Sequence, residues 1–245
     1  MPPAEYSAAD ALAKKIRLEK KIHALVIGDS LSDFYRGRNY VDMLNFWLNK
    51  YNPGKFTFRN AGAGGDFLTR VEARLNGMTN GKKAYRQEMY DRLFEENYDL
   101  VFIFLGQNDT YVTRSKNFDN PRVGPAEQEA VLRRVLDFIG KKSKAEIVLI
   151  SPSPSHEKLF LDRLASLKEG TDMGMFGAAK HVDAFDAVNR KACGERKLDY
   201  IDILHPMRQS PDLKALYVED GVHLSNEGAR LVSREVLRWF ASRKW

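Results

Sequence analysis

The chain has 245 residues, of which 43% are hydrophobic and 29% are charged, and its net charge is +6. These values are ordinary for a globular domain with a sizeable core, and no apolar run approaches the ~20 residues of a membrane-spanning helix. The basic residues are dispersed in pairs and no nucleic-acid-binding motif accompanies them, so we expect neither a membrane span nor a nucleic-acid partner.

Residues 1–21 mix alanines with lysines and acidic residues, without the apolar core of about 7–15 residues that a secretory signal has. We interpret this stretch as an N-terminal helical extension of a single domain that spans residues 1–245. As written, the chain is expected to be cytoplasmic, or secreted or periplasmic if a leader has been removed. The sequence does not predict the oligomeric state.

Strand-like and helix-like segments alternate along the rest of the chain. Apolar or alternating runs predict strands at residues 23–27, 56–60, 100–105, 147–150 and 200–204. Apolar residues at helical spacing predict helices at residues 41–51, 127–139, 182–189 and 229–240, with Ser225 as the N-cap of the last. This alternation predicts an α/β sandwich with a five-stranded, mainly parallel sheet. Residues 76–81, 110–125 and 151–177 are expected to be surface loops or small insertions around a site.

Four polar clusters follow predicted strands or precede the last helix. They are Gly28-Asp29-Ser30, residues 60–66 (N-A-G-A-G-G-D), Gly106-Gln107-Asn108-Asp109 and Asp220-Gly221-Val222-His223. In open parallel sheets, ligands bind beyond the carboxyl ends of the strands. We therefore expect these clusters to meet in one site.

Ser30 is the candidate nucleophile, because its hydroxyl follows a buried strand. A serine hydroxyl needs a base to take its proton, and His223 is the candidate base. Asp220, three residues earlier, can hold the second ring nitrogen of His223. Taken alone, the Asp-x-x-His spacing is more typical of a turn that caps a helix.

Acyl transfer also needs hydrogen-bond donors that face the developing oxyanion. The candidates are the backbone N–H groups of Ser30 and Gly65 and the side-chain amide of Asn108. Each of these residues alone is explained better by an ordinary turn. Four clusters in this order at corresponding strand ends are harder to attribute to chance.

These blocks resemble the SGNH (GDSL-type) hydrolase family. Gly28-Asp29-Ser30-Leu31-Ser32 is similar to its nucleophile block, and residues 60–66 are similar to its glycine block. Residues 106–109 match its G-x-N-D block and residues 220–223 its D-x-x-H block. The resemblance, which covers residues 25–228, implies a flavodoxin-like three-layer α/β/α fold and ester hydrolysis through an acyl-enzyme. It also implies that no metal or organic cofactor takes part.

Two alternatives concern these blocks. The glycine-rich stretch leaves Gly64 as a rival to Gly65 for the oxyanion donor, and the family pattern favours Gly65 because an acidic residue follows it. The α/β-hydrolase fold is the nearest rival that uses serine, but its G-x-S-x-G elbow requires a glycine where this chain has Ser32.

Residues close to Ser30 are candidates for a substrate pocket. Asp29, Tyr35, Arg36 and Arg38 are near enough in sequence, and arginines at a pocket mouth can hold a carboxylate or phosphate. A solvent-exposed loop is the alternative that we favour for the arginines. The scattered aspartates lack metal-ligand spacing, so no metal site is expected.

The blocks together predict a serine esterase that acts on a small or carbohydrate-linked ester, with O-deacetylation as a specific case. A lysophospholipase or thioesterase acting on longer acyl chains is the alternative within the enzyme class. A non-catalytic ligand-binding domain on the same scaffold is the alternative outside it.

Overall fold

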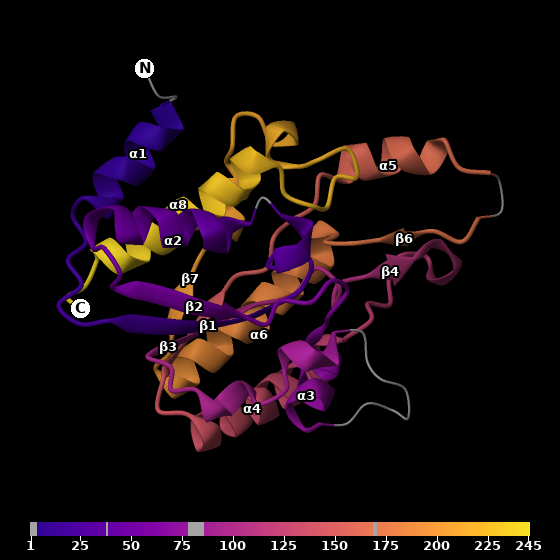
Figure 1. The fold of residues 1–245 in the computed structure, drawn as a ribbon. Coiled ribbons are helices and arrows are strands. Elements are labelled where there is room, and N and C mark those ends of the chain that lie inside the picture. The colour runs from indigo at the N-terminus through magenta and orange to yellow at the C-terminus, as the bar shows by residue number, and fades with distance from the viewer. Residues whose placement is uncertain (1–3, 38, 78–85, 169–170) are drawn as a thin grey trace.

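A computed structural model describes residues 4–37, 39–77, 86–168 and 171–245. A five-stranded sheet lies at its centre, with all neighbouring strands parallel and in the order β2-β1-β3-β5-β7 (Figure 1). The strands are β1 (Ile22–Gly28), β2 (Phe56–Asn60), β3 (Leu100–Phe104), β5 (Glu146–Ile150) and β7 (Asp199–Ile201). When these five strands are renumbered 1 to 5 in chain order, their order in the sheet is 2-1-3-4-5, as in flavodoxin. In that topology, the ligand crevice opens between the first and third strands.

Helices cover both faces of the sheet and make the three-layer α/β/α arrangement that the resemblance implied (Figure 1). One face carries α1 (Ala4–Ala13), α2 (Tyr40–Tyr51), α7 (Leu204–Arg208) and α8 (Asn226–Ala241). The other carries α3 (Leu68–Leu75), α4 (Pro125–Lys142) and α6 (Ala179–Arg196). The predicted helices at α2, α4, α6 and α8 are therefore confirmed.

The strand side chains divide between two cores, because successive residues of a strand point to opposite faces. In β1, Ala24 and Val26 pack beneath α2 and α8, whereas Leu25 and Ile27 pack beneath α3 and α4. Strand β3 is buried at every position, as a central parallel strand must be. Ser225 caps α8 as expected, since its hydroxyl accepts the N–H groups of Glu227 and Gly228.

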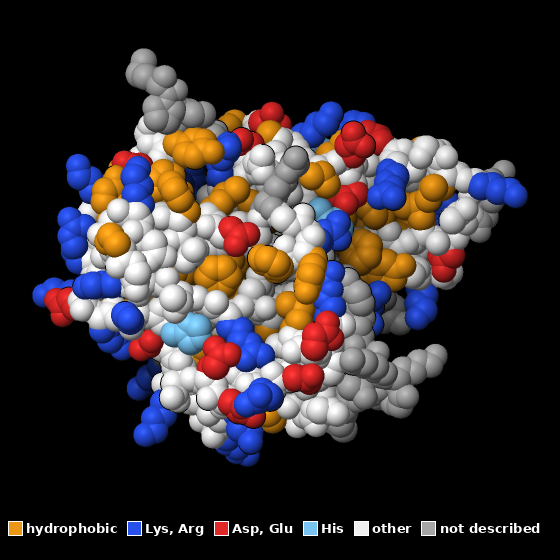
Figure 2. Space-filling model, viewed as in Figure 1, with side chains coloured by type: hydrophobic (Ala, Val, Ile, Leu, Met, Phe, Trp, Pro, Cys, Tyr) orange, Lys and Arg blue, Asp and Glu red, His pale blue; other side chains and the backbone are white. Residues whose placement is uncertain are grey.

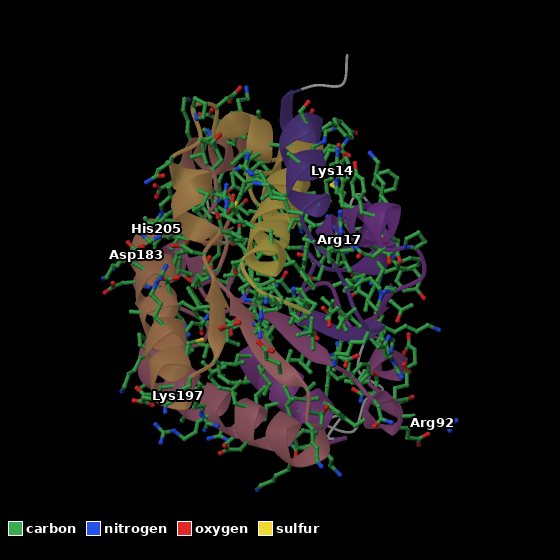
Figure 3. The ribbon with its side chains drawn as sticks, turned by 90° about the vertical axis from the view of Figure 1, so that its left-hand side faces the viewer. Lys14, Arg17, Arg92, Asp183, Lys197 and His205 are labelled. Atoms are coloured by element: carbon green, nitrogen blue, oxygen red, sulfur yellow. The ribbon has the colours of Figure 1, made fainter. Side chains whose placement is uncertain are left out.

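The N-terminal segment is helical over Ala4–Ala13 and is part of the first core. Ala13, Ile16 and Leu18 are buried there against residues of α2 and α8. Within the described ranges, no helix has both the length and the apolar character needed to cross a bilayer. Charged side chains such as Lys14, Arg17, Arg92 and Lys197 are spread around the molecule (Figure 3).

The segments expected to be loops contain more regular structure than predicted. Residues 151–177 carry α5 (Glu157–Ala165) and β6 (Gly174–Met175), and residues 110–125 carry β4 (Val112–Thr113), which pairs antiparallel with β6. Residues 78–81 of the first predicted loop lie outside the described residues.

The last predicted strand was too long, because β7 ends at Ile201 and Leu204 begins α7. The Ser151 hydroxyl accepts the N–H groups of Ile203 and Leu204 at 2.8 and 2.9 Å, which turns the chain away from the sheet.

Candidate active site

Ser30 lies in a tight turn at the carboxyl end of β1. The buried Asp29 side chain accepts the N–H of Leu31 at 2.9 Å, and the N–H of Ser32 donates to the Asp29 carbonyl at 3.1 Å. These two bonds reverse the chain immediately after the strand. Ser30 is left half-buried at the tip of the turn, facing the cavity described below.

His223 and Asp220 reach the same point from the loop before α8. His223 Nε2 lies 3.0 Å from Ser30 Oγ, and His223 Nδ1 lies 2.6 Å from Asp220 Oδ2. The other carboxylate oxygen of Asp220 accepts the N–H groups of Val222 and His223 at 2.9 and 2.8 Å. Serine, imidazole and carboxylate thus form a continuous hydrogen-bonded chain, which is the geometry of a catalytic triad.

The electrostatics of the hydrogen-bonded Ser30–His223–Asp220 series favour an ionised Asp220 carboxylate. Burial by itself would raise the pKa of Asp220, but the hydrogen bonds from the ring and N–H of His223 and from the N–H of Val222 hold that pKa well below its ordinary value. A charged Asp220 fixes the imidazole tautomer in which Nε2 is unprotonated and can accept the serine proton.

The loop that carries His223 is anchored to the start of α5. Gly221 has a φ of 70°, and the N–H of His156 donates to its carbonyl at 2.7 Å. A Cβ atom at position 221 would lie 2.8 Å from the His156 carbonyl oxygen. The D-x-x-H block therefore needs glycine at its second position for a local steric reason.

The candidate oxyanion donors surround the same space. Gly64 N–H already donates to Asp33 Oδ2 at 2.8 Å, whereas Gly65, with a φ of 79°, has no acceptor for its N–H among the described residues. The side-chain amide of Asn108 donates to the Asp66 carbonyl at 3.0 Å and also interacts with the buried Asp29 side chain, and Asn108 lines the cavity. This geometry favours Gly65 over Gly64.

Buried carboxylates lie behind the donor loops. Asp66 faces Arg74 of α3, with Oδ1–Nη2 and Oδ2–Nε distances of 2.9 and 2.8 Å, and Asp109 accepts the N–H of Leu68 at 2.8 Å. Burial raises the pKa of Asp29 to about 8 and that of Asp109 to about 7, although backbone N–H donors partly oppose both shifts. These groups hold the loops in place from beneath.

A cavity of about 410 Å³ opens above the serine. The candidate residues Ser30, Asp220, His223, Gly65 and Asn108 all line it. The rest of its wall comes from residues that include Asp33, Arg36, Arg86, Gln107, Phe160, Arg163, Phe176 and Val222. Figure 2 shows basic and hydrophobic side chains interspersed on the molecular face viewed in Figure 1.

The structure places the four predicted pocket residues in different surroundings. Arg36 lines the cavity, but Asp29 is 1% exposed and lies beneath the turn, out of reach of a ligand. Tyr35 is 69% exposed and stacks under Arg86 instead of lining the cavity. Neither Asp29 nor Tyr35 therefore lines the cavity, and Arg38 lies outside the described residues.

Several wall residues were missed by sequence reasoning. Arg86, Phe160 and Arg163 belong to segments without a recognisable block, and only the fold brings them to Ser30. The one signal in the sequence was the spacing of Phe160 and Arg163, which places them on one face of a helix.

Comparison with known proteins adds a second line of argument. The model of the GDSL-like lipase/acylhydrolase family matches residues 26–231. The GDSL esterase/lipase WDL1 of Oryza sativa subsp. japonica is 22% identical over 203 residues, which cover 78% of this chain and 75% of the rice protein. The GDSL esterase/lipase CPRD49 of Arabidopsis thaliana is 22% identical over 197 residues, which cover 75% of this chain and 74% of that protein.

Solved structures share the fold. A lipase/acylhydrolase from Enterococcus faecalis has a TM-score of 0.65 at 18% identity, over 91% of this chain and 96% of that one. A variant of Axe2, an acetyl xylan esterase from Geobacillus stearothermophilus, has a TM-score of 0.64 at 21% identity, over 92% of this chain and 96% of that one.

Proposed function

Because the chain belongs to the GDSL-like lipase/acylhydrolase family, we propose that it is a serine esterase that hydrolyses a small or carbohydrate-linked ester through an acyl-enzyme. The observation that carries the proposal is the hydrogen-bonded chain from Ser30 through His223 to Asp220, with the Gly65 and Asn108 donors lining the same cavity.

The geometry suits a two-step acyl transfer. His223 Nε2 takes the Ser30 proton as Oγ attacks the ester carbonyl, and the charged Asp220 stabilises the imidazolium that results. The N–H groups of Ser30, Gly65 and Asn108 then donate to the carbonyl oxygen as it becomes negative. His223 gives the proton to the departing alkoxide, so the alcohol leaves and Ser30 remains acylated.

Release of the acyl group repeats the same proton movements with water. His223 takes a proton from water, the hydroxide attacks the acyl-enzyme carbonyl, and the same donors hold the second oxyanion. Collapse of this intermediate returns the proton to Ser30 and frees the carboxylic acid. His223 serves as base and acid in turn without moving away from Ser30.

The size of the cavity supports a small acyl group, such as acetyl. About 410 Å³ is at the lower end of the range for small-molecule sites, and its apolar wall comes from Phe160, Phe176 and Val222. The structural likeness to acetyl xylan esterases is consistent with O-deacetylation of a carbohydrate. A lysophospholipase or thioesterase would need a longer apolar groove. Faster turnover of palmitoyl than of acetyl esters would indicate such an enzyme.

Hydrolysis of p-nitrophenyl acetate by the wild type and two serine variants tests the proposal. Ser30→Ala should lower kcat by several orders of magnitude with the far-UV circular dichroism unchanged. Ser32→Ala is the matched control, because Ser32 is fully buried two residues away, and it should keep activity within several-fold. Equal turnover by Ser30→Ala and the wild type would refute the proposal and leave a non-catalytic binding domain.

A further inference from the structure

The wall of the catalytic cavity contains three arginines, Arg36, Arg86 and Arg163. Two acidic residues, Asp33 and Asp220, share that wall. Some of these charges are neutralised within the protein, and the others are available to a substrate.

The two carboxylates are each committed to a partner. Asp33 forms an ion pair with Arg86 and accepts the N–H groups of Gly64 and Tyr35, and Asp220 is bonded to His223. Arg86 and Asp33 balance each other at the edge of the glycine loop. Because Asp220 is ionised beside a neutral imidazole, these five charged side chains leave a net positive charge on the cavity wall, and its guanidinium groups outside an ion pair with any described residue are those of Arg36 and Arg163.

Arg163 is placed in the wall by α5. Phe160 is buried at 6% exposure and lines the cavity beside Val222, and Arg163 lies three residues further along the same helix face. The bond between His156 N–H and the Gly221 carbonyl ties the start of this helix to the His223 loop. The backbone of Arg163 is thus placed beside the catalytic centre, and its exposed side chain lines the cavity.

The surroundings of Arg163 include further acidic groups. A neighbouring cavity, which shares Arg163 and Asp220, is also lined by Asp162, Asp212, Lys214 and Glu219. Asp162 pairs with Lys158 at 2.9 Å, and none of these carboxylates forms an ion pair with Arg163. Across the described part of the chain, the guanidinium of Arg163 has no hydrogen-bond or ion-pair partner.

Arg36 reaches the cavity from a different segment, the single 3-10 turn Phe34–Arg36 that follows the nucleophile block. Asp33 caps this turn through the N–H of Tyr35 at 3.0 Å and holds the glycine loop through Gly64. The guanidinium of Arg36 likewise makes no ion pair with any residue that the structure describes. An unpaired guanidinium prefers carboxylate or phosphate oxygens.

We propose that Arg36 and Arg163 select esters that carry a negative charge, a carboxylate or a phosphate, on the part of the substrate next to the scissile bond. This deepens the esterase proposal and rests on it. In this account, the anion lies between Ser30 and the two guanidinium groups and orients the ester carbonyl toward the Gly65 and Asn108 donors. Arg36 and Arg163 are specificity residues that touch the substrate away from the reacting atoms.

Two matched substrate pairs test the proposal, one for each side of the ester. The first compares 4-acetoxybenzoate with its neutral methyl ester, and the second compares the p-nitrophenyl hemiester of succinate with p-nitrophenyl butyrate. In at least one pair, kcat/KM of the wild type should be about tenfold higher for the charged member at low ionic strength. The preference should shrink as salt is added, because exposed charges are screened.

Three variants show whether these arginines cause the preference for the charged ester: Arg36→Gln, Arg163→Gln and the double variant. The double variant should lose the preference for the charged ester, measured as the ratio of kcat/KM between the charged and neutral members of a pair. Arg133→Gln is the matched control, because Arg133 is exposed on α4 and does not line the cavity, and it should keep the preference. A preference that survives in the double variant would overturn the assignment.

Failure of this inference is distinguishable from failure of the esterase proposal. Equal turnover of charged and neutral members in both pairs would refute the anion preference and leave the esterase intact. If the wild type hydrolyses no ester, the anion site is tested instead by measuring, with calorimetry, how tightly the same substrate pairs bind to the Ser30→Ala variant. Tighter binding of a charged member that requires Arg36 or Arg163 would uphold the anion site, and equal binding would refute it.

Discussion

His223 Nε2 lies 3.0 Å from Ser30 Oγ, although 193 residues separate the two along the chain. Ser30 is positioned by the end of β1, and His223 by the loop that precedes α8. Both segments open onto the carboxyl edge of the parallel sheet, where the strand order reverses beside β1 and β3. The topology thus assembles the proposed triad without any rearrangement of the chain.

The role of Asp220 can be tested by a substitution that removes the charge but keeps the shape of the side chain. Asp220→Asn removes the charge that stabilises the imidazolium and allows the wrong tautomer of His223, so kcat should fall by about 10³–10⁴. Steady-state hydrolysis of p-nitrophenyl acetate measures this. Asp212→Asn, which alters an exposed carboxylate at the Ala215 turn, should leave kcat unchanged. An Asp220→Asn enzyme within tenfold of the wild type would exclude Asp220 from the triad.

Asn108 is proposed as a side-chain donor to the oxyanion. Asn108→Ala removes that donor, and kcat should fall by about 10²–10³ with little change in KM, because the bond strengthens only as negative charge develops. Asn120→Ala, at an exposed position, is the control. A rise in KM with an unchanged kcat would show that Asn108 binds the ground state instead.

The buried ion pair between Asp66 and Arg74 should matter more for folding than its exposed neighbour. The Arg74 and Asp66 side chains are 1% and 0% exposed, so Arg74→Ala leaves a buried carboxylate unpaired and should cost about 3–5 kcal/mol. Arg70 lies 3.8 Å from the same carboxylate but is 43% exposed, and Arg70→Ala should cost less than about 1 kcal/mol. Urea unfolding of both variants measures the difference. Equal costs would contradict the structural role assigned to Arg74.

The raised pKa of Asp29 predicts how stability depends on pH. Because burial raises this pKa from 3.8 to about 8, the folded state keeps a proton that the unfolded chain has already lost above pH 3.8. The stabilisation is therefore complete below that value and declines as the pH rises toward about 8. The free energy of unfolding of the wild type should fall between about pH 5 and pH 8, by at least about 1 kcal/mol more than that of Asp29→Asn. Parallel pH profiles of the two proteins would show that Asp29 is ionised in the native state.

The strands, the main helices and the residues of the proposed triad could be predicted because each has a local signal. Apolar runs mark β1 and β3, and short blocks mark Ser30 and the Asp220–His223 turn. Helix α3 was missed, although Leu68 and Val71 are spaced for a helix and buried in it. The helix has only 8 residues, so its helical pattern is short.

The cavity wall could not be predicted, because it depends on contacts between distant segments. Phe160 and Arg163 reach the site because α5 is held there by the bond between His156 and Gly221 and by packing of Phe160 against Val222, contacts that no local pattern indicates. Asp29 and Tyr35 are close to the nucleophile in sequence, but Asp29 is buried beneath the turn and Tyr35 is exposed to solvent. Closeness in sequence is a poor guide to which side chains line a pocket at a tight turn.

Identification of the residue modified by a fluorophosphonate tests the central claim most directly. The reagent reacts only with a serine that a neighbouring base activates. Mass spectrometry of the digested adduct identifies the labelled serine and so tests whether His223 activates Ser30. We predict a single phosphonyl group on the peptide that contains Ser30, and its loss in His223→Ala. An unmodified protein, or a label on any other residue, would contradict the account.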